Sequence, residues 1–322
     1  MRQGAGPPGG SEQTPTTQEL GMSKIGFIGV GVMGRPMASN VRKKGYSVTI
    51  YDINKTAVEE MRKEGFAVAG SPREVAEQTD VIITMLPSSP HVAAVTLGEN
   101  GVLEGIRPGC VYVDMSTIDP TTTVEVGAKI QGKGAFMLDS PVVKGVSSAI
   151  DGTLTLYIGG EAAVLEKVRP VLECMGTTLL HMGKLGAGEV TKLVNNMCLA
   201  TIVGATSEVF VFGAKLGVDT DKLFAALENG SAASRALSTH VKALGLKRKF
   251  DKLTFPAGFM MKDLDLGLKT ARDNGFPLFY PNLTYTLYSM LKSSGRGKAN
   301  YSEIIRIFED YAGVLAESAD KA

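Results

Sequence analysis

The chain has 322 residues, of which 44% are hydrophobic and 21% are charged, and its formal net charge at pH 7 is +1. This balance offers no bulk electrostatic attraction for nucleic acid or for a membrane surface. We find no apolar run that approaches the roughly 20 residues of a membrane span, so we expect a soluble cytoplasmic protein whose partners are small molecules or copies of itself.

The N-terminal segment carries no recognisable targeting pattern. Its first 21 residues lack the apolar core of a secretory signal and the arginine-rich amphipathic pattern of a transit peptide. They are rich in glycine, proline, threonine and glutamine. We therefore predict a disordered extension over residues 1–22.

Strand and helix patterns alternate from residue 23 onward. The segments KIGFIGV (24–30) and SVTIYD (47–52) are strand patterns, and each precedes an amphipathic helix pattern. Five more strand patterns follow, at residues 80–86, 110–116, 135–142, 153–160 and 177–183. Helical patterns separate most of them, so we predict an α/β Rossmann domain, a doubly wound sheet, over residues 23–186.

The character of the chain changes after Gly188. Residues 189–217 contain no proline and few polar residues on any face of a helix, which predicts one long buried helix. Helical patterns continue to the C-terminus in DTDKLFAALENG, KDLDLGLKTARDNG and SEIIRIFEDYAGVLAESADK. We predict an all-α domain over residues 187–322, joined to the first domain by the long helix. Because a helix that is apolar all round needs cover on every side, we expect a homodimer or homotetramer.

The three cysteines are Cys110, Cys174 and Cys198, and they have neither CxxC nor metal-ligand spacing. Their surroundings are apolar. We therefore predict reduced core thiols and no metal site.

The segment GVGVMG fits the pattern G-x-G-x-x-G between a predicted strand and a predicted helix. Its first glycine allows a tight turn, its second lets a pyrophosphate approach the backbone, and its third lets helix and strand pack closely. The helix N-terminus would face the phosphates. The predicted cofactor contacts in this loop are Gly29, Gly31, Val32, Met33 and Gly34.

Asp52 ends the second predicted strand, 18 positions after Gly34. An acidic side chain there would accept hydrogen bonds from the ribose hydroxyls of adenosine, which favours NAD over NADP. Asp52 could instead cap the next helix, and Lys55 leaves some positive charge near the position of a 2′-phosphate. We predict NAD as the cofactor, with NADP as the alternative.

Lys192, Asn195 and Asn196 lie at positions i, i+3 and i+4 of the long predicted helix, so their side chains share one face. Apolar neighbours such as Leu193 and Met197 argue against a solvated face, because a buried ammonium is costly without a partner or a function. Desolvation lowers the pKa of a lysine, which suits it to exchange a proton with a substrate hydroxyl. We predict that Lys192 is catalytic.

Five segments, in order along the chain, resemble the signature motifs of the β-hydroxyacid dehydrogenase family, which includes 3-hydroxyisobutyrate dehydrogenase and tartronate semialdehyde reductase. The segments are GFIGVGVMGRPMASN, DMST, DSPVVKGVSSAIDGTLTLYIGG, GAGEVTKLVNN and KDLDLGLKTARDNGFPL. The resemblance covers the chain from Ser23 to the C-terminus. It implies an NAD(P)-binding Rossmann domain, a helical domain that helps to form oligomers, and an active site between them.

The resemblance also implies roles for single residues. Lys192 takes the position of the family's catalytic lysine, and Asn196 takes that of the asparagine that orients the substrate or the lysine. We also predict substrate contacts from Ser116, in DMST, and from Asn195.

Three further segments match cofactor contacts of the family. Leu86-Pro87 and Thr117 match segments that touch the cofactor, and Lys262 matches a lysine of the helical domain that closes over it. Each has a structural alternative: a strand end at Pro87, a helix cap at Thr117 and a solvated surface at Lys262.

The anion-binding loop departs from the family pattern D-x-P-V-S-G-G, because Val143 replaces the serine and Lys144 replaces the first glycine, before Gly145. A hydroxyl donor is lost and a cation is gained, so the loop still suits an anion. Sulfolactaldehyde reductases of the family carry a basic residue here and also resemble this chain near SSGRGKANYSEI. Lys144 therefore indicates a short aldehyde bearing a sulfonate or a second carboxylate. Alternatively, Lys144 points to solvent, and Gly145 and Val146 bind an ordinary carboxylate through backbone amides.

We expect reversible hydride transfer between nicotinamide and the alcohol or aldehyde carbon of a short anionic 3-hydroxy acid or its sulfonate analogue. Two alternatives are a non-catalytic dinucleotide-binding module and an imine reductase of the same fold. The first should lack the lysine and asparagine pair, and relatives of the second kind often replace the lysine. Lys192 and Asn196 are both present.

Overall fold

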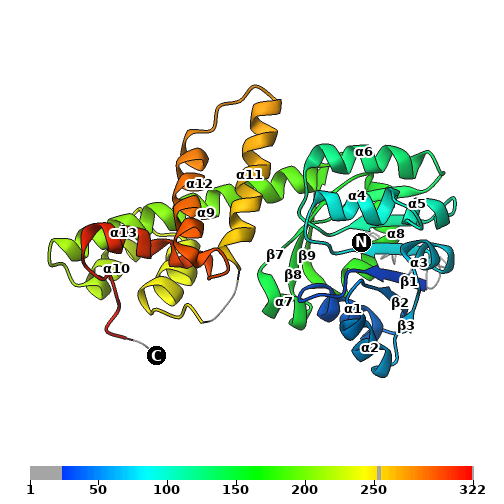
Figure 1. The fold of residues 1–322 in the computed structure, drawn as a ribbon, viewed down its shortest axis with the longest axis horizontal. Helices are drawn as coiled ribbons and strands as arrows, with labels where there is room; N and C mark the ends of the chain where they lie inside the picture. Colours follow the sequence, from blue (N-terminus) through cyan, green and yellow to red (C-terminus); the bar gives the residue numbers. More distant parts are fainter. Residues whose placement is uncertain (1–23, 252–254, 321–322) are drawn as a thin grey trace, which may run out of the picture.

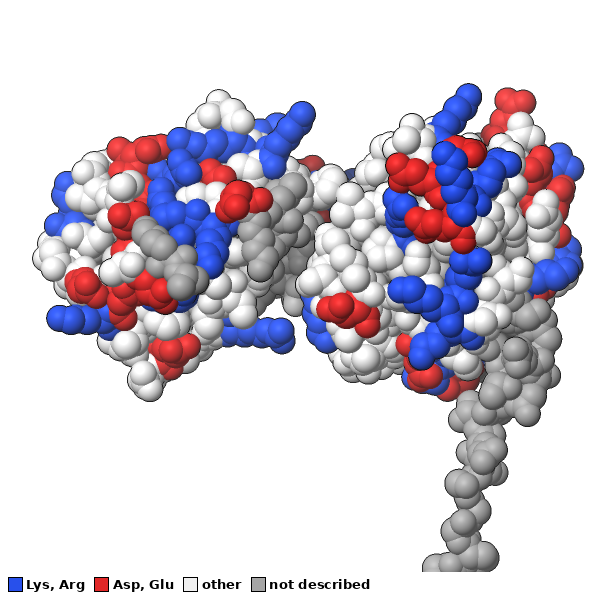
Figure 2. Space-filling view, turned by 90° about the horizontal axis from the view of Figure 1, so that it is seen from below, with Lys and Arg blue, Asp and Glu red and all other residues white. Residues whose placement is uncertain are grey.

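The computed structural model describes residues 24–251 and 255–320, so the predicted extension lies outside the described residues. Figure 1 shows two domains joined by one long helix, α9 (Ala187–Lys215). Figure 2 shows the same two lobes meeting at a narrow waist, with basic and acidic side chains interspersed over both.

The first domain is a nine-stranded sheet with helices on its faces. Its strands are β1 (Lys24–Ile28), β2 (Ser47–Tyr51), β3 (Ala67–Val68), β4 (Val81–Thr84), β5 (Val111–Asp114), β6 (Phe136–Asp139), β7 (Val142–Val143), β8 (Leu154–Gly159) and β9 (Gly176–Gly183). Its helices are α1 (Gly34–Lys43), α2 (Lys55–Lys63), α3 (Pro72–Gln78), α4 (Ser89–Leu97), α5 (Val102–Gly105), α6 (Pro120–Gln131), α7 (Gly145–Asp151) and α8 (Ala162–Leu172).

The strand order confirms the predicted doubly wound sheet. It runs β3-β2-β1-β4-β5-β6-β8-β7, with β9 beside β8, and the pairs from β3 to β6 are parallel. The order reverses between β1 and β4, and ligands bind at such a reversal beyond the carboxyl ends of the strands. Every residue of β4 and β5 is buried, as expected for parallel strands covered on both faces.

The second domain is helical, which confirms the predicted all-α class. Beside α9 it contains α10 (Thr220–Glu228), the π-helix η1 (Leu237–Leu246), α11 (Ala257–Asp273), α12 (Phe279–Leu291), the short π-helix η2 (Lys292–Arg296), the 3-10 helix η3 (Tyr301–Ile304) and α13 (Ile305–Ala312). The last predicted helix is shorter than its pattern suggested. It ends at Gly313, whose φ of +69° is left-handed and stops the helix.

Helix α9 differs from the prediction of a helix buried on every side. One side packs against β8, α11, α12 and α13, whereas Val194 and Phe212 on the other side are 55% and 63% exposed. The prediction of core thiols is right for Cys110 and Cys174 and wrong for Cys198, because Cys198 lies on the uncovered side.

The expectation that no apolar run approaches the length of a membrane span was wrong for the same helix. By its length and a mean hydropathy of 1.7, α9 could do so. The core helix of a globular protein passes the same test, and here Lys192 bonds to the first domain while Asn196 bonds to the second. These contacts place the first turns of α9 between the two domains.

Candidate active site

The loop between β1 and α1 has the shape that a bound dinucleotide requires. Gly29 has a φ of +91°, and a Cβ there would lie 2.4 Å from the Met85 carbonyl oxygen. A Cβ on Gly34 would lie 1.9 Å from the Gly29 carbonyl oxygen, whereas one on Gly31 would meet nothing within 4 Å. The backbone is therefore open where a phosphate must approach.

The rest of this loop also fits an anion. Val32 is 74% exposed, and Met33 precedes α1 without offering a side-chain cap to its first N–H groups. Uncapped N–H groups at a helix N-terminus attract negative charge. The residues present thus fit the pyrophosphate of NAD(P).

Asp52 lies directly beside this loop. Its Oδ2 accepts a hydrogen bond from the Val30 N–H at 2.7 Å, and its Oδ1 accepts one from the Asn54 N–H at 2.7 Å. The cap of α2 is Asn54, which accepts hydrogen bonds from the two N–H groups that follow Lys55. Asp52 is therefore free of the capping role and is fixed beside the glycine loop.

The segments after β4 and β5 are joined by one hydrogen-bond chain. The Leu86 N–H donates to Ser116 Oγ at 2.9 Å, and Ser116 Oγ donates to Asp114 Oδ1 at 2.5 Å. This chain fixes the two segments that carry Pro87 and Thr117. The Ser116 hydroxyl is buried and bonded inward here, so a substrate contact from Ser116 stays a prediction.

Lys192 projects from α9 toward the 143–146 loop. Its Nζ donates to the Val142 carbonyl oxygen at 2.8 Å, and the residue is only 8% exposed. Burial lowers the pKa of the Lys192 ammonium below its usual value, while the charges of Asp263 and Glu189 act in the opposite direction. The structure thus places a desolvated amine at the start of the 143–146 loop.

The two asparagines that follow Lys192 on α9 are bonded to each other and, through Asp263, to α11. Asn195 Nδ2 donates to Asn196 Oδ1 at 3.0 Å, and Asn196 Nδ2 donates to Asp263 Oδ2 at 2.6 Å. The Tyr157 hydroxyl donates to Asn195 Oδ1 at 3.4 Å. Asp263, which is 2% exposed, was missed by sequence reasoning, although it directly follows Lys262 in the segment KDLDLG.

Lys262 reaches from α11 to the predicted cofactor segment. Its Nζ donates to the Thr117 carbonyl oxygen at 2.6 Å and pairs with Asp263 at 3.1 Å. Further along α11, Lys269 pairs with Asp119 at 2.9 Å. Two lysines of the helical domain therefore meet the segment between β5 and α6.

Lys144 has an unusual backbone. Its φ of +89° is left-handed, a region that favours glycine, and it lies between Val143, the end of β7, and Gly145, the start of α7. The side chain is exposed, and its Nζ donates to the Thr153 carbonyl oxygen at 3.0 Å. Lys144 is therefore tethered to Thr153, which lies beyond α7 and directly before β8.

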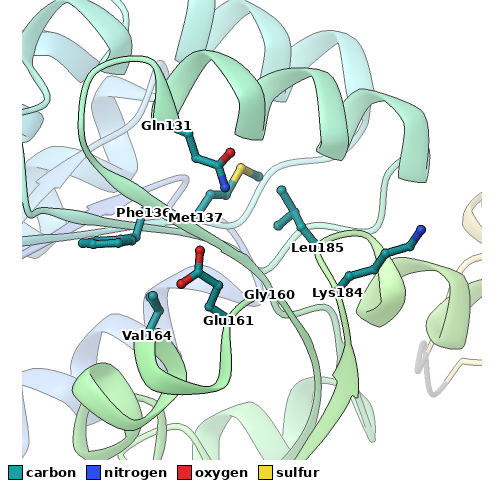
Figure 3. A pocket seen from close by; sticks show the side chains of 8 residues that line it. All are labelled: Gln131, Phe136, Met137, Gly160, Glu161, Val164, Lys184 and Leu185. Atoms are coloured by element: carbon teal, nitrogen blue, oxygen red, sulfur yellow. The ribbon is translucent and has the colours of Figure 1, made fainter.

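A hollow of about 280 Å³ lies elsewhere on the first domain (Figure 3). It opens between α6 and α8 and contains none of the residues predicted for the site. Its lining residues are Gln131, Phe136, Met137, Gly160, Glu161, Val164, Lys184 and Leu185. The candidate active site is instead assembled by hydrogen bonds among β5, β7, α9 and α11.

Comparison with known proteins agrees with this geometry. The model for the NAD-binding domain of 6-phosphogluconate dehydrogenase matches residues 24–183, and that for the NAD-binding domain of NADP-dependent 3-hydroxyisobutyrate dehydrogenase matches residues 186–308.

Full-length relatives agree as well. The chain is 37% identical to a probable mitochondrial 3-hydroxyisobutyrate dehydrogenase of Dictyostelium discoideum, covering 87% of this chain and 89% of the relative. It is 34% identical to an NAD-dependent L-serine dehydrogenase of Pseudomonas aeruginosa, covering 91% and 100%. A solved 3-hydroxyisobutyrate dehydrogenase of Mycobacterium tuberculosis with L-serine has a TM-score of 0.83 at 32% identity, covering 89% and 99%. The chain belongs to the β-hydroxyacid dehydrogenase family, whose members are oxidoreductases with an NAD(P)-binding domain.

Proposed function

We propose that this protein interconverts a short anionic 3-hydroxy acid, or its sulfonate analogue, and the corresponding semialdehyde by hydride transfer with NAD. The observation that carries the proposal is the buried Lys192 Nζ, 2.8 Å from the carbonyl oxygen that opens the anion-binding loop. Two relatives are named for 3-hydroxyisobutyrate and L-serine, and both compounds are short carboxylates with a hydroxyl on the third carbon. A lysine at this position also argues against an imine reductase.

The residues divide the chemistry among them. The glycine loop and Asp52 would hold NAD(H), which would accept or supply the hydride. In the reducing direction, Lys192 gives a proton to the substrate oxygen, and Asn196, held by Asp263, keeps amine and oxygen in register. The 143–146 loop binds the anionic tail, and Lys262 holds the helical domain against the cofactor segment, which excludes water.

The substrate class depends on Lys144. We propose that its ammonium leaves the Thr153 carbonyl and binds the anionic tail, because a flexible, exposed lysine can exchange a neutral acceptor for a charged one. A left-handed φ at a residue other than glycine costs roughly 1–3 kcal/mol and is typical of functional loops. This supports a sulfonate or a second carboxylate as the ligand.

Replacing Lys144 with alanine should lower the ratio of kcat/KM for sulfolactaldehyde to that for methylmalonate semialdehyde at least about tenfold, the loss expected for one charge-assisted hydrogen bond. The measurement is the initial rate of NADH oxidation. Lys144→Gly separates charge from backbone strain, and Lys133→Ala, an exposed lysine elsewhere, is the control. An unchanged ratio would mean that an ordinary carboxylate binds through backbone amides and that Lys144 is a surface residue.

For the cofactor, Asp52→Asn should lower the preference for NADH over NADPH at least about tenfold, because it removes the charge that repels a 2′-phosphate and weakens a charged hydrogen bond to the ribose. The ratio of kcat/KM for the two cofactors measures this. Glu99→Gln, an exposed acid elsewhere, is the matched control. A preference for NADPH in the unaltered protein would overturn the assignment of NAD.

We also propose that the protein is a homodimer or homotetramer. Apolar side chains on α9 and α12 support this, since they are exposed in the single chain and a second copy would cover them. They are Val190, Val194, Val209, Phe212, Phe279, Tyr280, Leu283 and Met290. Light scattering that gives the mass of one chain would contradict the proposal.

A further inference from the structure

Three carboxyl groups are buried together where α9 meets the sheet. Asp114 and Asp139 end the neighbouring strands β5 and β6 and are paired in register, and Glu189 lies in the first turn of α9. All three residues are 0% exposed. Among the described residues, no group of His, Cys, Asp and Glu has the arrangement of a metal site. Three carboxyl groups buried together without a metal ion disfavour the fully ionised state, because like charges repel and burial penalises each charge.

The hydrogen bonds show which group is short of a donor. Asp139 accepts one N–H on each oxygen, from Gly186 at 2.7 Å and from Glu189 at 2.8 Å. Asp114 Oδ1 accepts bonds from the Thr84 hydroxyl and from both the N–H and the hydroxyl of Ser116. These donors are satisfied by carboxylates, so neither pattern requires a proton on the oxygens concerned.

Glu189 accepts fewer hydrogen bonds than either aspartate. Its Oε2 accepts one hydrogen bond, from the Ile118 N–H at 3.2 Å. Its Oε1 and Asp114 Oδ2 are both buried without a hydrogen-bond partner within the part of the chain that the structure describes. Two buried acceptors without donors are costly, and one proton placed between two carboxyl groups satisfies both.

We propose that Glu189 is a positioning residue that acts as a neutral carboxylic acid, accepting from the Ile118 N–H and donating its proton to Asp114. It thereby joins the first turn of α9 to the cofactor segment 115–118. Lys192 lies one turn further along the same helix, so the two hydrogen bonds of Glu189 help to set the position of its amine. The role in positioning rests on the function proposed for Lys192.

The electrostatics support the position of the proton. Burial raises the pKa of Glu189 well above its usual value, and the charges of Asp114 and Asp139 raise it further, whereas the Ile118 N–H and Lys262 act in the opposite direction. Burial raises the pKa of Asp114 to about 6. Near neutral pH the proton therefore belongs to Glu189.

The charged groups that face Glu189 come from every neighbouring element. They are Asp114 on β5, Asp139 on β6, Lys262 on α11 and Lys192 on its own helix. An ionised Glu189 would repel both aspartates and would raise the pKa of Lys192. The neutral acid avoids both effects, which leaves Asp263 as the main negative charge acting on the amine.

Glu189→Gln tests the proposal, because glutamine donates and accepts as the neutral acid does and cannot ionise. In the unaltered protein the unfolded state releases the Glu189 proton near pH 4.5, its ordinary pKa, whereas the folded state retains it. The stabilisation that neutral Glu189 gives the unaltered protein, compared with Glu189→Gln, is therefore complete below pH 4.5 and decreases as the pH rises. The ratio of the folding equilibrium constant of the unaltered protein to that of Glu189→Gln should fall by up to about tenfold per pH unit between pH 5 and 8.

Urea unfolding of the full chain at each pH, without substrate, measures this difference. Glu208→Gln, on the exposed side of the same helix, should leave the pH dependence unchanged. A difference between Glu189→Gln and the unaltered protein that is constant from pH 5 to 8 would overturn the proposal, because it would mean that Glu189 does not hold a proton that the unfolded state releases.

Kinetics test the positioning role separately. Glu189→Ala removes both hydrogen bonds and should lower kcat at least about tenfold, and Glu189→Gln should recover most of that loss. Failure of glutamine to recover activity would overturn the role of the neutral acid in positioning. Because unfolding is measured without turnover, an error in the function proposed for Lys192 would leave the result for the proton intact.

Discussion

Replacing Lys192 with alanine is expected to lower kcat by about 100-fold to 10,000-fold, the usual contribution of a positioned general acid. The amine is buried and bonded to the Val142 carbonyl oxygen, so no other lysine can take its place without rearrangement. NADH binding should persist, because the glycine loop follows β1 and Asp52 follows β2, away from α9. Initial rates and fluorescence titration with NADH measure the two quantities.

The pH dependence of the unaltered enzyme should have opposite signs in the two directions. Burial lowers the pKa of Lys192 below its usual value of 10.5. Reduction needs the protonated amine, so its rate should fall as pH rises through that pKa, and oxidation needs the free amine, so its rate should rise. Lys215→Ala, at the other end of α9, is the matched control. Turnover that is unchanged in Lys192→Ala would remove Lys192 from the mechanism.

Replacing Asp139 with alanine is expected to cause the largest loss of stability, about 3 kcal/mol in the free energy of unfolding. Both carboxylate oxygens accept N–H groups from the start of α9, and the residue is fully buried. A Cβ on Gly188 would lie 2.7 Å from Asp139 Oδ2, so glycine is needed there for the helix to approach this closely. Without Asp139, two buried N–H groups lose their acceptor.

Urea unfolding followed by circular dichroism measures this loss. Asp139→Asn retains one acceptor oxygen and should lose about half as much stability. Activity should fall as well, because Asp139 holds the helix that carries Lys192. A change of less than about 0.5 kcal/mol in Asp139→Ala, the range of ordinary surface substitutions, would show that α9 is held in place by packing alone.

Much of the fold could be predicted from the sequence, because strand and helix periodicity are local properties of the chain. The alternating patterns predicted the strands of the sheet and the long helix. The two-residue strand β3 was not predicted, because it is too short to show a pattern. The glycine loop could also be predicted, since the spacing of Gly29, Gly31 and Gly34 acts within a few residues.

The sequence also placed Lys192, Asn195 and Asn196 on one face of a helix, because the pitch of an α-helix fixes the direction of each side chain. It did not show what covers that face. Asp263 lies 67 positions from Asn196, and Glu189 lies 71 positions from its donor Ile118. The packing of segments that are far apart in the chain determines these partners.

For this protein, then, local patterns in the sequence determined the two domains, the dinucleotide loop and the candidate lysine. Only the tertiary structure decided that Ser116 bonds inward, that Lys144 is tethered to Thr153, that one side of α9 is uncovered and that Glu189 is buried together with two aspartates. The physical reason is that burial and hydrogen-bond partners, which set both pKa and orientation, arise when segments far apart in the chain pack together.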